Sequence, residues 1–287
     1  MNPIAAVLLS WSFDPLVIVG LVLVAVLYVR GLRRLSARGG VDRHVGTGAL
    51  AAAVFGWLLL VLALLSPIAV FGGYFLTAHM VQHLILTQIA APLLLMGRPV
   101  PTLVLGLPAR IGRDIAPLLA RDGPLYPIGS FLTRPPVALI VFLVVFFGWH
   151  VPPLYDAAIR VTLVHDLEHF SFFWAAILFW WGAVDPISGR NQRRRLLSLV
   201  AIAIAFMAGS VLGILFVFTP EIIYPSYQVG PALFGISPRD DQIAGGLVMW
   251  IAGSLLYAIA ALIVLSAAMQ AEERALRRRE AREAAIA

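Results

Sequence analysis

The 287-residue sequence contains no cysteine and no lysine, and only 13% of its residues are charged. Without cysteine, the chain cannot form a disulfide framework, an iron–sulfur site or a thiolate metal site. With 61% hydrophobic residues and a mean hydropathy of +0.92, it holds more apolar side chain than a soluble domain can bury. The composition therefore predicts an integral membrane protein.

Seven apolar stretches can cross a hydrocarbon layer of about 30 Å, which takes roughly 20 residues of helix. We expect spans at residues 14–30, 48–66, 75–97, 135–151, 164–184, 196–218 and 242–267. They predict an all-α membrane protein, a seven-transmembrane-helix bundle that forms a single domain over residues 1–287.

The connecting segments add three expectations. Residues 102–134 mix apolar residues and arginines at a helical period, which is typical of a segment lying on the membrane surface. Residues 268–287 continue the last span as a charged helix. Residues 219–239, rich in Pro, Gly and Tyr, are expected to form a lid over the outer end of the bundle. Residues 1–13 lack a basic start and a small-residue cleavage site, so we expect no removable signal peptide.

The positive charge is distributed unevenly between the two sides. Of the 21 arginines, only Arg160 and Arg239 fall in loops after the even-numbered spans. All others, including Arg38, Arg43 and Arg190, follow spans one, three, five and seven, so the positive-inside rule places the N-terminus outside and the C-terminus in the cytoplasm. The net charge of +6 then faces anionic lipid head groups of the bilayer, and we expect no nucleic-acid partner.

Five of the six histidines lie at the predicted outer ends of spans. His79 and His83 begin the third span, His150 ends the fourth, and His165 and His169 begin the fifth. Each pair reads H-x-x-x-H, which places both rings on one helix face, and imidazole is the commonest protein ligand for metals. We predict that a ring of one pair lies within about 8 Å of a ring of the other, a distance that a metal or small cluster can bridge. We expect His150 to be an auxiliary metal ligand, although it is equally well explained as a hydrogen-bonded anchor.

Other polar and sulfur-containing side chains lie near these histidines. Glu168 shares a helix face with His165 and His169. Residues that are candidates to orient or assist the ligands are Glu168, Asp240, Asp241, Gln242, Met80 and Met249. The aspartates are also typical helix caps, and methionine is an ordinary filler of helix interfaces.

Three chemistries fit such a cluster. Histidines with optional methionine or carboxylate and no thiolate favour copper, with zinc and iron as alternatives. A haem b held by two histidines is a weaker alternative because these rings lie close to the outer mouth. Residues His165–His169 (HDLEH) also match H-x-x-E-H, in which two histidines hold zinc and the glutamate is a general base, so a membrane metalloprotease is a rival interpretation.

Several of these stretches resemble the polytopic cytochrome c oxidase assembly factor CtaG family. They are Ala78–His83 (AHMVQH), Ala91–Gly97 (APLLLMG), His165–His169 (HDLEH), Tyr224–Tyr227 (YPSY), and Asp241–Gly245 (DQIAG) followed by Met249–Trp250. The resemblance runs from about Tyr74 to Ala267. It implies a seven-helix protein of the bacterial cytoplasmic membrane that is needed to form active oxidase and handles copper on the outer side.

The resemblance also implies partners and site residues. The partners would be cytochrome c oxidase subunits or an extracytoplasmic copper donor. His79, His83, His165 and His169 are similar to the histidines of the family pattern, with Asp240 or Asp241 and Gln242 at the start of the last span. The sequence therefore predicts a copper-binding assembly factor, with the metalloprotease and the haem protein as alternatives.

Overall fold

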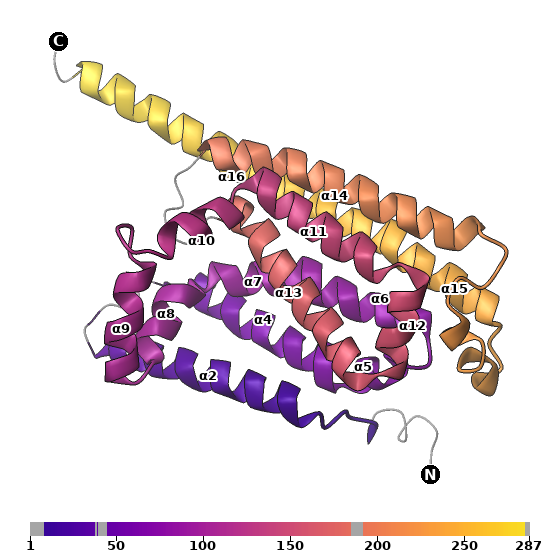
Figure 1. The fold of residues 1–287 in the computed structure, drawn as a ribbon. Coiled ribbons are helices and arrows are strands. Elements are labelled where there is room, and N and C mark those ends of the chain that lie inside the picture. Colours follow the sequence, from indigo (N-terminus) through magenta and orange to yellow (C-terminus); the bar gives the residue numbers. More distant parts are fainter. Residues whose placement is uncertain (1–8, 38, 40–44, 185–191, 285–287) are drawn as a thin grey trace.

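The computed structural model describes residues 9–37, 39, 45–184 and 192–284, and every regular element in these ranges is helical (Figure 1). The all-α prediction is confirmed. Arg38, Arg43 and Arg190, residues 1–8 and residues 285–287 lie outside the described residues.

Six helical stretches are long and apolar enough to cross a membrane. Four are single helices: α2 (Pro15–Ser36), α4 (Thr47–Leu65), α13 (Thr162–Val184) and α14 (Gln192–Phe218). Two are composite and contain a π-helical segment. One consists of α6 (Leu76–Leu84), η1 (Ile85–Ala90) and α7 (Ala91–Met96), and the other of α15 (Pro238–Leu247), η4 (Val248–Ala252) and α16 (Gly253–Ala284).

The predicted fourth span is shorter than the others. Helix α11 (Pro135–Trp149) has 15 residues and is therefore about 22 Å long. It reaches the length of a span only together with α10 (Tyr126–Leu132), and the two helices are bent by 69° at the break between them. The structure thus supports six spans, or seven if the bent pair is one span, and the orientation of the termini stays a prediction.

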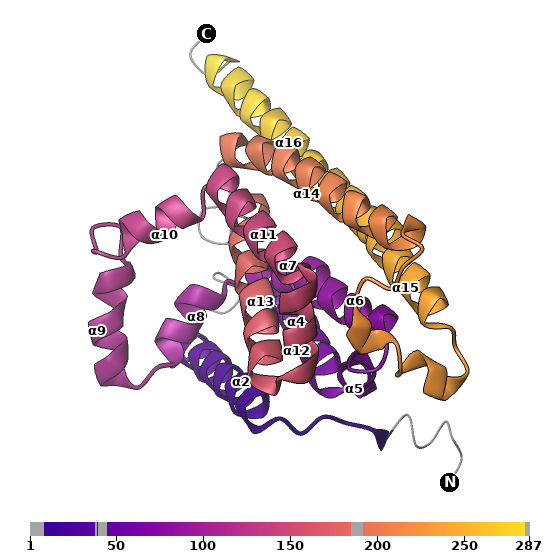
Figure 2. The ribbon, with the colours of Figure 1, turned by 45° about the vertical axis from the view of Figure 1, so that its right-hand side comes forward.

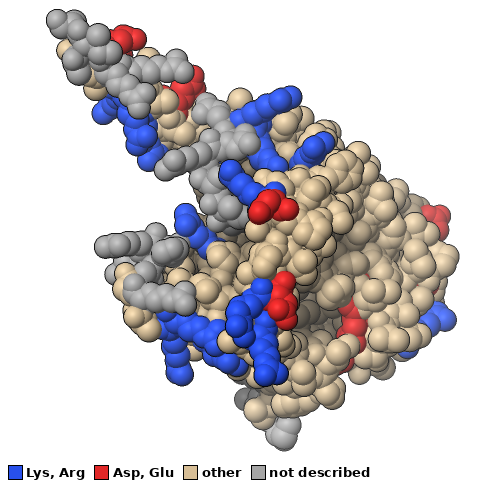
Figure 3. Space-filling model, turned by 60° about the vertical axis from the view of Figure 1, so that its left-hand side comes forward, with Lys and Arg blue, Asp and Glu red and all other residues tan. Residues whose placement is uncertain are grey.

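Short helices occupy the two ends of the bundle. Helix α5 (Pro67–Gly72), helix α12 (Pro152–Arg160) and the start of α15 lie at one end, with the 3-10 turns η2 (Pro225–Tyr227) and η3 (Pro231–Phe234). Helix α9 (Ala109–Leu119) and α10 lie at the other (Figures 1 and 2). Figure 3 shows arginines gathered on the side from which α16 projects, next to a broad surface of uncharged side chains. This separation matches the uneven charge of the sequence.

The segment between the third and fourth predicted spans folds as three short helices. Helix α8 (Pro99–Gly106) packs closely on α2. The helices approach each other at Gly31, where an added Cβ would lie only 1.9 Å from the carbonyl oxygen of Thr102. Arg34 of α2 donates hydrogen bonds to the carbonyls of Leu105 and Leu107. By contrast, α9 buries none of its residues, as a segment lying on a surface would.

The π-helical segment η1 leaves one carbonyl that another helix satisfies. The N–H of Ala91 donates to Leu86, so it does not reach the carbonyl of Thr87, and Pro92 has no N–H to offer. The Thr87 carbonyl therefore lacks a donor from its own helix. The indole of Trp180 on α13 donates to it at 2.7 Å. This bond attaches α13 to the helix that carries His79 and His83.

Candidate metal centre

Helix α6 presents His79 and His83 one turn apart, and their rings meet. The Nε2 atoms of the two rings are 2.7 Å from each other. The start of this helix is held by a residue from the far end of the sequence. The buried carboxylate of Asp241 on α15 accepts hydrogen bonds from the N–H of Leu76 at 2.7 Å and of Thr77 at 3.1 Å. A carboxylate there satisfies amides that have no partner within the helix and complements its dipole.

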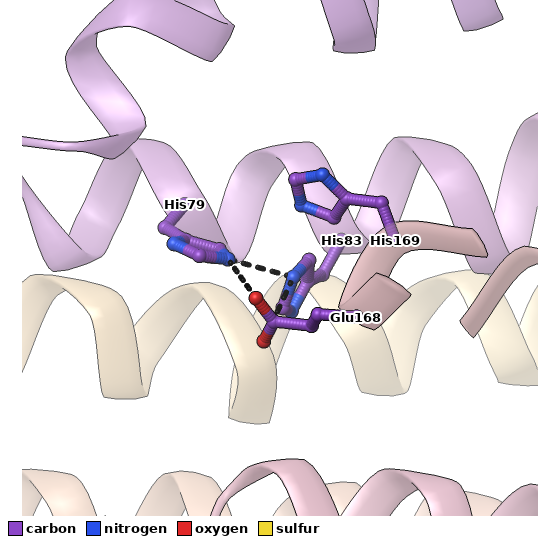
Figure 4. A group of neighbouring side chains, drawn as sticks. All are labelled: His79, His83, Glu168 and His169. Atoms are coloured by element: carbon purple, nitrogen blue, oxygen red, sulfur yellow. Dashed lines mark hydrogen bonds and ion pairs between the residues drawn. The ribbon is translucent and has the colours of Figure 1, made fainter. Parts of the chain in front are cut away.

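Helix α13 supplies the other half of the group. Glu168 points its carboxylate at the rings of His79 and His83, and His169 lies beside them (Figure 4). Oε2 of Glu168 is 3.5 Å from Nε2 of His79, and Oε1 is 3.6 Å from Nε2 of His83. Each of these four buried residues offers one ligand atom, and these atoms all lie within 4.8 Å of one another. We call His79, His83, Glu168 and His169 the histidine–glutamate group.

The separations within this group can be compared with a metal site. Ligands placed tetrahedrally around zinc at roughly 2.0–2.1 Å are about 3.3–3.4 Å apart. The three separations of 2.7, 3.5 and 3.6 Å lie on both sides of that value. Movements of the side chains by a few tenths of an ångström would bring the atoms of His79, His83 and Glu168 around one ion, and the ligand atom of His169 lies within 4.8 Å of each of them.

The polar atoms of the group are otherwise poorly satisfied. Three buried atoms of the group, both carboxylate oxygens of Glu168 and Nε2 of His169, have no hydrogen-bond partner within the described part of the chain. A buried carboxylate without a donor is costly unless a cation neutralises it. A metal ion or a protonated imidazole would supply that charge, so the residues fit a metal.

Tyr227 determines which nitrogen of His79 is free. Its hydroxyl donates to the carbonyl of Gly72 at 2.7 Å, which uses its only proton. Burial raises the pKa of Tyr227 well above its usual range, so the phenol keeps that proton. Nδ1 of His79, 3.0 Å from the same hydroxyl, must therefore donate to it. Nε2 then carries the lone pair and faces the histidine–glutamate group.

Two more tyrosines enclose the histidines at the end of the bundle that carries α5 and α12. The rings of Tyr155 on α12 and Tyr224 are stacked 3.9 Å apart, and Tyr155 lies 5.2 Å from the ring of His79. The hydroxyl of Tyr224 donates to the carbonyl of His150. Residues 219–239, which were expected to form a lid, thus contact the site through Tyr224 and Tyr227. Their roles were missed in the sequence, where the YPSY stretch was the only sign of them.

The other two predicted histidines lie next to the group but outside it. The ring of His165 is 5.5 Å from that of His79 and 4.2 Å from that of His169, and it is half-buried. The ring of His150 is 6.3 Å from that of His83. All five rings therefore converge, and the predicted approach of the two pairs is confirmed by the separation of 5.1 Å between His83 and His169.

The remaining candidates hold backbone or line the interior. Asp240 is exposed. The N-cap of α15 is Ser237, so the expectation that the aspartates cap this helix is wrong. Asp241 instead caps the start of α6. Gln242 accepts from the N–H of Ile223 at 2.8 Å and donates to three carbonyls of residues 216–221, which holds the lid. Met80 and Met249 are buried and belong to one apolar cluster beside the histidines.

The sequence of residues 26–271 matches the family described as cytochrome c oxidase caa3 assembly factor (Caa3_CtaG). The chain belongs to this family. No solved structure matches it.

Relatives are found in mycobacteria. The chain is 29% identical to the uncharacterized protein Mb0105 of Mycobacterium bovis over 189 residues, which cover 64% of this chain and 28% of that protein. It is 25% identical to the uncharacterized protein ML1998 of Mycobacterium leprae over 249 residues, which cover 85% of this chain and 37% of that protein. The chain thus spans about a third of the length of the curated relatives it matches.

Proposed function

We propose that this protein binds copper at the histidine–glutamate group and supports the loading of a copper centre of cytochrome c oxidase. The observation that carries the proposal is the convergence of four buried ligand atoms within 4.8 Å in a member of an oxidase assembly family. Histidine and carboxylate ligands without thiolate favour copper among the metals. The proposal includes His165, half-buried beside His169, as the residue that receives the ion before it reaches the group.

The charge of the group favours a monovalent ion. Three neutral imidazoles and one carboxylate carry a single negative charge, which Cu(I) would cancel and Cu(II) would exceed. A net charge in a buried site within a membrane is costly, so the neutral complex is the better stabilised one. Copper would here be cargo that the protein holds and releases.

The proposed setting is the bacterial cytoplasmic membrane, with the histidine end of the bundle facing outward. Support comes from the arginines, most of which lie toward the opposite end. An extracytoplasmic copper donor would then reach the site from the same side as the oxidase subunits that receive the ion.

The two rival functions fit the geometry less well. In the H-x-x-E-H hypothesis His165 and His169 hold zinc and Glu168 acts on water, yet Glu168 lies between His79 and His83 while His165 lies outside the group. The matching family is described as an assembly factor and not as a protease. A haem would lie between rings from different helices, and the 5.1 Å between the ring centres of His83 and His169 leaves no slot for it.

The test uses the source organism with its own gene deleted and variants supplied in its place. Cells with His79→Ala/His83→Ala should lose oxidase activity and recover part of it when copper is added in excess. Glu168→Gln keeps the volume of the side chain but removes the charge that balances Cu(I), so it should weaken copper binding, while the three remaining imidazoles leave part of the function. Asp166→Asn, on the same helix but outside the group, is the matched control.

Two outcomes would overturn the proposal. One is full oxidase activity in the double histidine variant at limiting copper. The other is complete loss of function in Glu168→Gln with the bound metal retained. The protease hypothesis predicts that result, because glutamine cannot replace the glutamate as a general base. A Soret band in the purified protein would point to haem instead.

A further inference from the structure

A second group of potential ligands lies on the other side of His83. Next to the histidine–glutamate group, and sharing His83 with it, lies a small cavity of about 40 Å³. Its lining includes Met80, His83, His150 and Met249. A space needs at least about 10–15 Å³ to hold one water molecule, so this cavity can take an ion or a few waters. Phe142, Phe146 and Phe172 form much of the rest of its wall.

His150 is prepared as a ligand in this cavity. Its Nδ1 is 2.6 Å from the carbonyl oxygen of Phe146, and because a carbonyl only accepts, Nδ1 carries the proton. Nε2 therefore has a free lone pair. This atom is buried and has no hydrogen-bond partner in the described ranges, in a side chain that is only 7% exposed. A buried acceptor with nothing to accept from indicates a missing ligand.

The sulfur atoms point to the class of that ligand. Met80 is 1% and Met249 is 8% exposed, and both pack in the same apolar cluster as they line the cavity. Met249 lies in the π-helical segment η4, a distortion that is frequent at functional sites. Thioether and imidazole are ligands for Cu(I). None of the described residues that line the cavity is acidic, so a divalent ion would bring two uncompensated charges.

We propose that this cavity is a second cation site, specific for a soft monovalent ion, in which Nε2 of His150 and the thioethers of Met80 and Met249 are the ligands. The ring of His83 stands between the two sites, 5.1 Å from His169 and 6.3 Å from His150. The inference rests on the proposed function for the identity of the ion, copper. The two sites give the protein a capacity of two Cu(I) ions, one with nitrogen and oxygen ligands and one with sulfur.

The experiment measures copper in the purified full-length protein, loaded anaerobically with Cu(I) against a competing chelator. Metal analysis gives the stoichiometry, and X-ray absorption at the copper edge detects sulfur ligands. The wild type should bind two equivalents with a sulfur contribution. Met80→Leu/Met249→Leu should bind one equivalent without sulfur, whereas Met207→Leu/Met269→Leu, two exposed methionines, should match the wild type.

Two further variants separate the two sites. His150→Asn keeps a donor near the Phe146 carbonyl but removes Nε2, so it should also lose one equivalent. His79→Ala/His169→Ala removes two ligands of the histidine–glutamate group and should leave one sulfur-bound ion. If the wild type binds a single ion without sulfur ligands, the second site is wrong and the proposed function stands. If the wild type binds no copper, both are wrong.

Discussion

The hydroxyl of Tyr227 lies 3.0 Å from Nδ1 of His79 and, by donating its own proton to Gly72, makes that nitrogen the donor. The ligand nitrogen of His79 is thus set by a residue 148 positions away. A hydrogen bond of this kind orients an imidazole for metal binding and raises its basicity.

Removal of this hydroxyl should weaken copper binding without abolishing it. In Tyr227→Phe we expect a 10–100-fold loss of affinity, the usual effect of losing a group that orients a metal ligand. A competition titration with a Cu(I) chelator measures it. Tyr28→Phe also loses one hydrogen bond, to Gly97 beside α7, and should bind copper as the wild type does. Equal affinities of Tyr227→Phe and the wild type would mean that the tautomer of His79 is unimportant.

The cap of α6 should distinguish the two adjacent aspartates. Asp241→Ala leaves the amides of Leu76 and Thr77 without their acceptor, and we expect a loss of about 1–2 kcal/mol in the free energy of unfolding. The exposed Asp240 makes the matched variant, because Asp240→Ala should change stability by less than about 0.5 kcal/mol. Thermal unfolding in detergent measures both. A larger effect at Asp240 would contradict the assignment of Asp241 as the cap.

Trp180 should stabilise the π-helical segment. Trp180→Phe removes the donor to the Thr87 carbonyl and leaves that buried group unsatisfied, which costs about 1–3 kcal/mol. Trp174→Phe changes a half-exposed indole on the same helix and is the control. An unfolding midpoint of Trp180→Phe that stays at the wild-type value would contradict the stabilising role of this hydrogen bond.

The orientation of the chain is tested with reporters fused after Ala287. A reporter that is active only in the cytoplasm should be active there, because all arginines except Arg160 and Arg239 are assigned to that side. A reporter that needs export should be inactive at the same position. An active exported reporter would place the histidines on the cytoplasmic face and exclude uptake of copper from outside.

The sequence predicted best those features that depend on residues close together in the chain. Spacing of four residues was sufficient to pair His79 with His83, and apolar length was sufficient to find six of the predicted spans. The start of α11 at Pro135 agrees with the predicted start of the fourth span, where Arg134 and two prolines mark the boundary. The π-helical segments η1 and η4 were not foreseen, because nothing in the residue pattern distinguishes them from the α-helices that they interrupt.

Long-range contacts were beyond the sequence. Glu168 was expected to orient its neighbours, but the packing of α13 on α6 places its oxygens among the potential ligand atoms. Asp241 was a candidate metal-assisting residue or a cap of its own helix, yet it binds amides 165 positions earlier. Such partners depend on how helices pack, which no spacing within one helix encodes.

If the histidine–glutamate group holds copper, the purified protein should contain this metal, and removal of two of the ligands should lower its content. Wild-type protein and His79→Ala/His83→Ala should be purified side by side from copper-supplemented cells and analysed for metals, with Asp166→Asn as the control. We expect at least one copper per chain in the wild type and the control, and at least one equivalent less in the double variant. Equal copper in the wild type and the double variant, or a wild type that carries another metal in its place, would contradict this expectation.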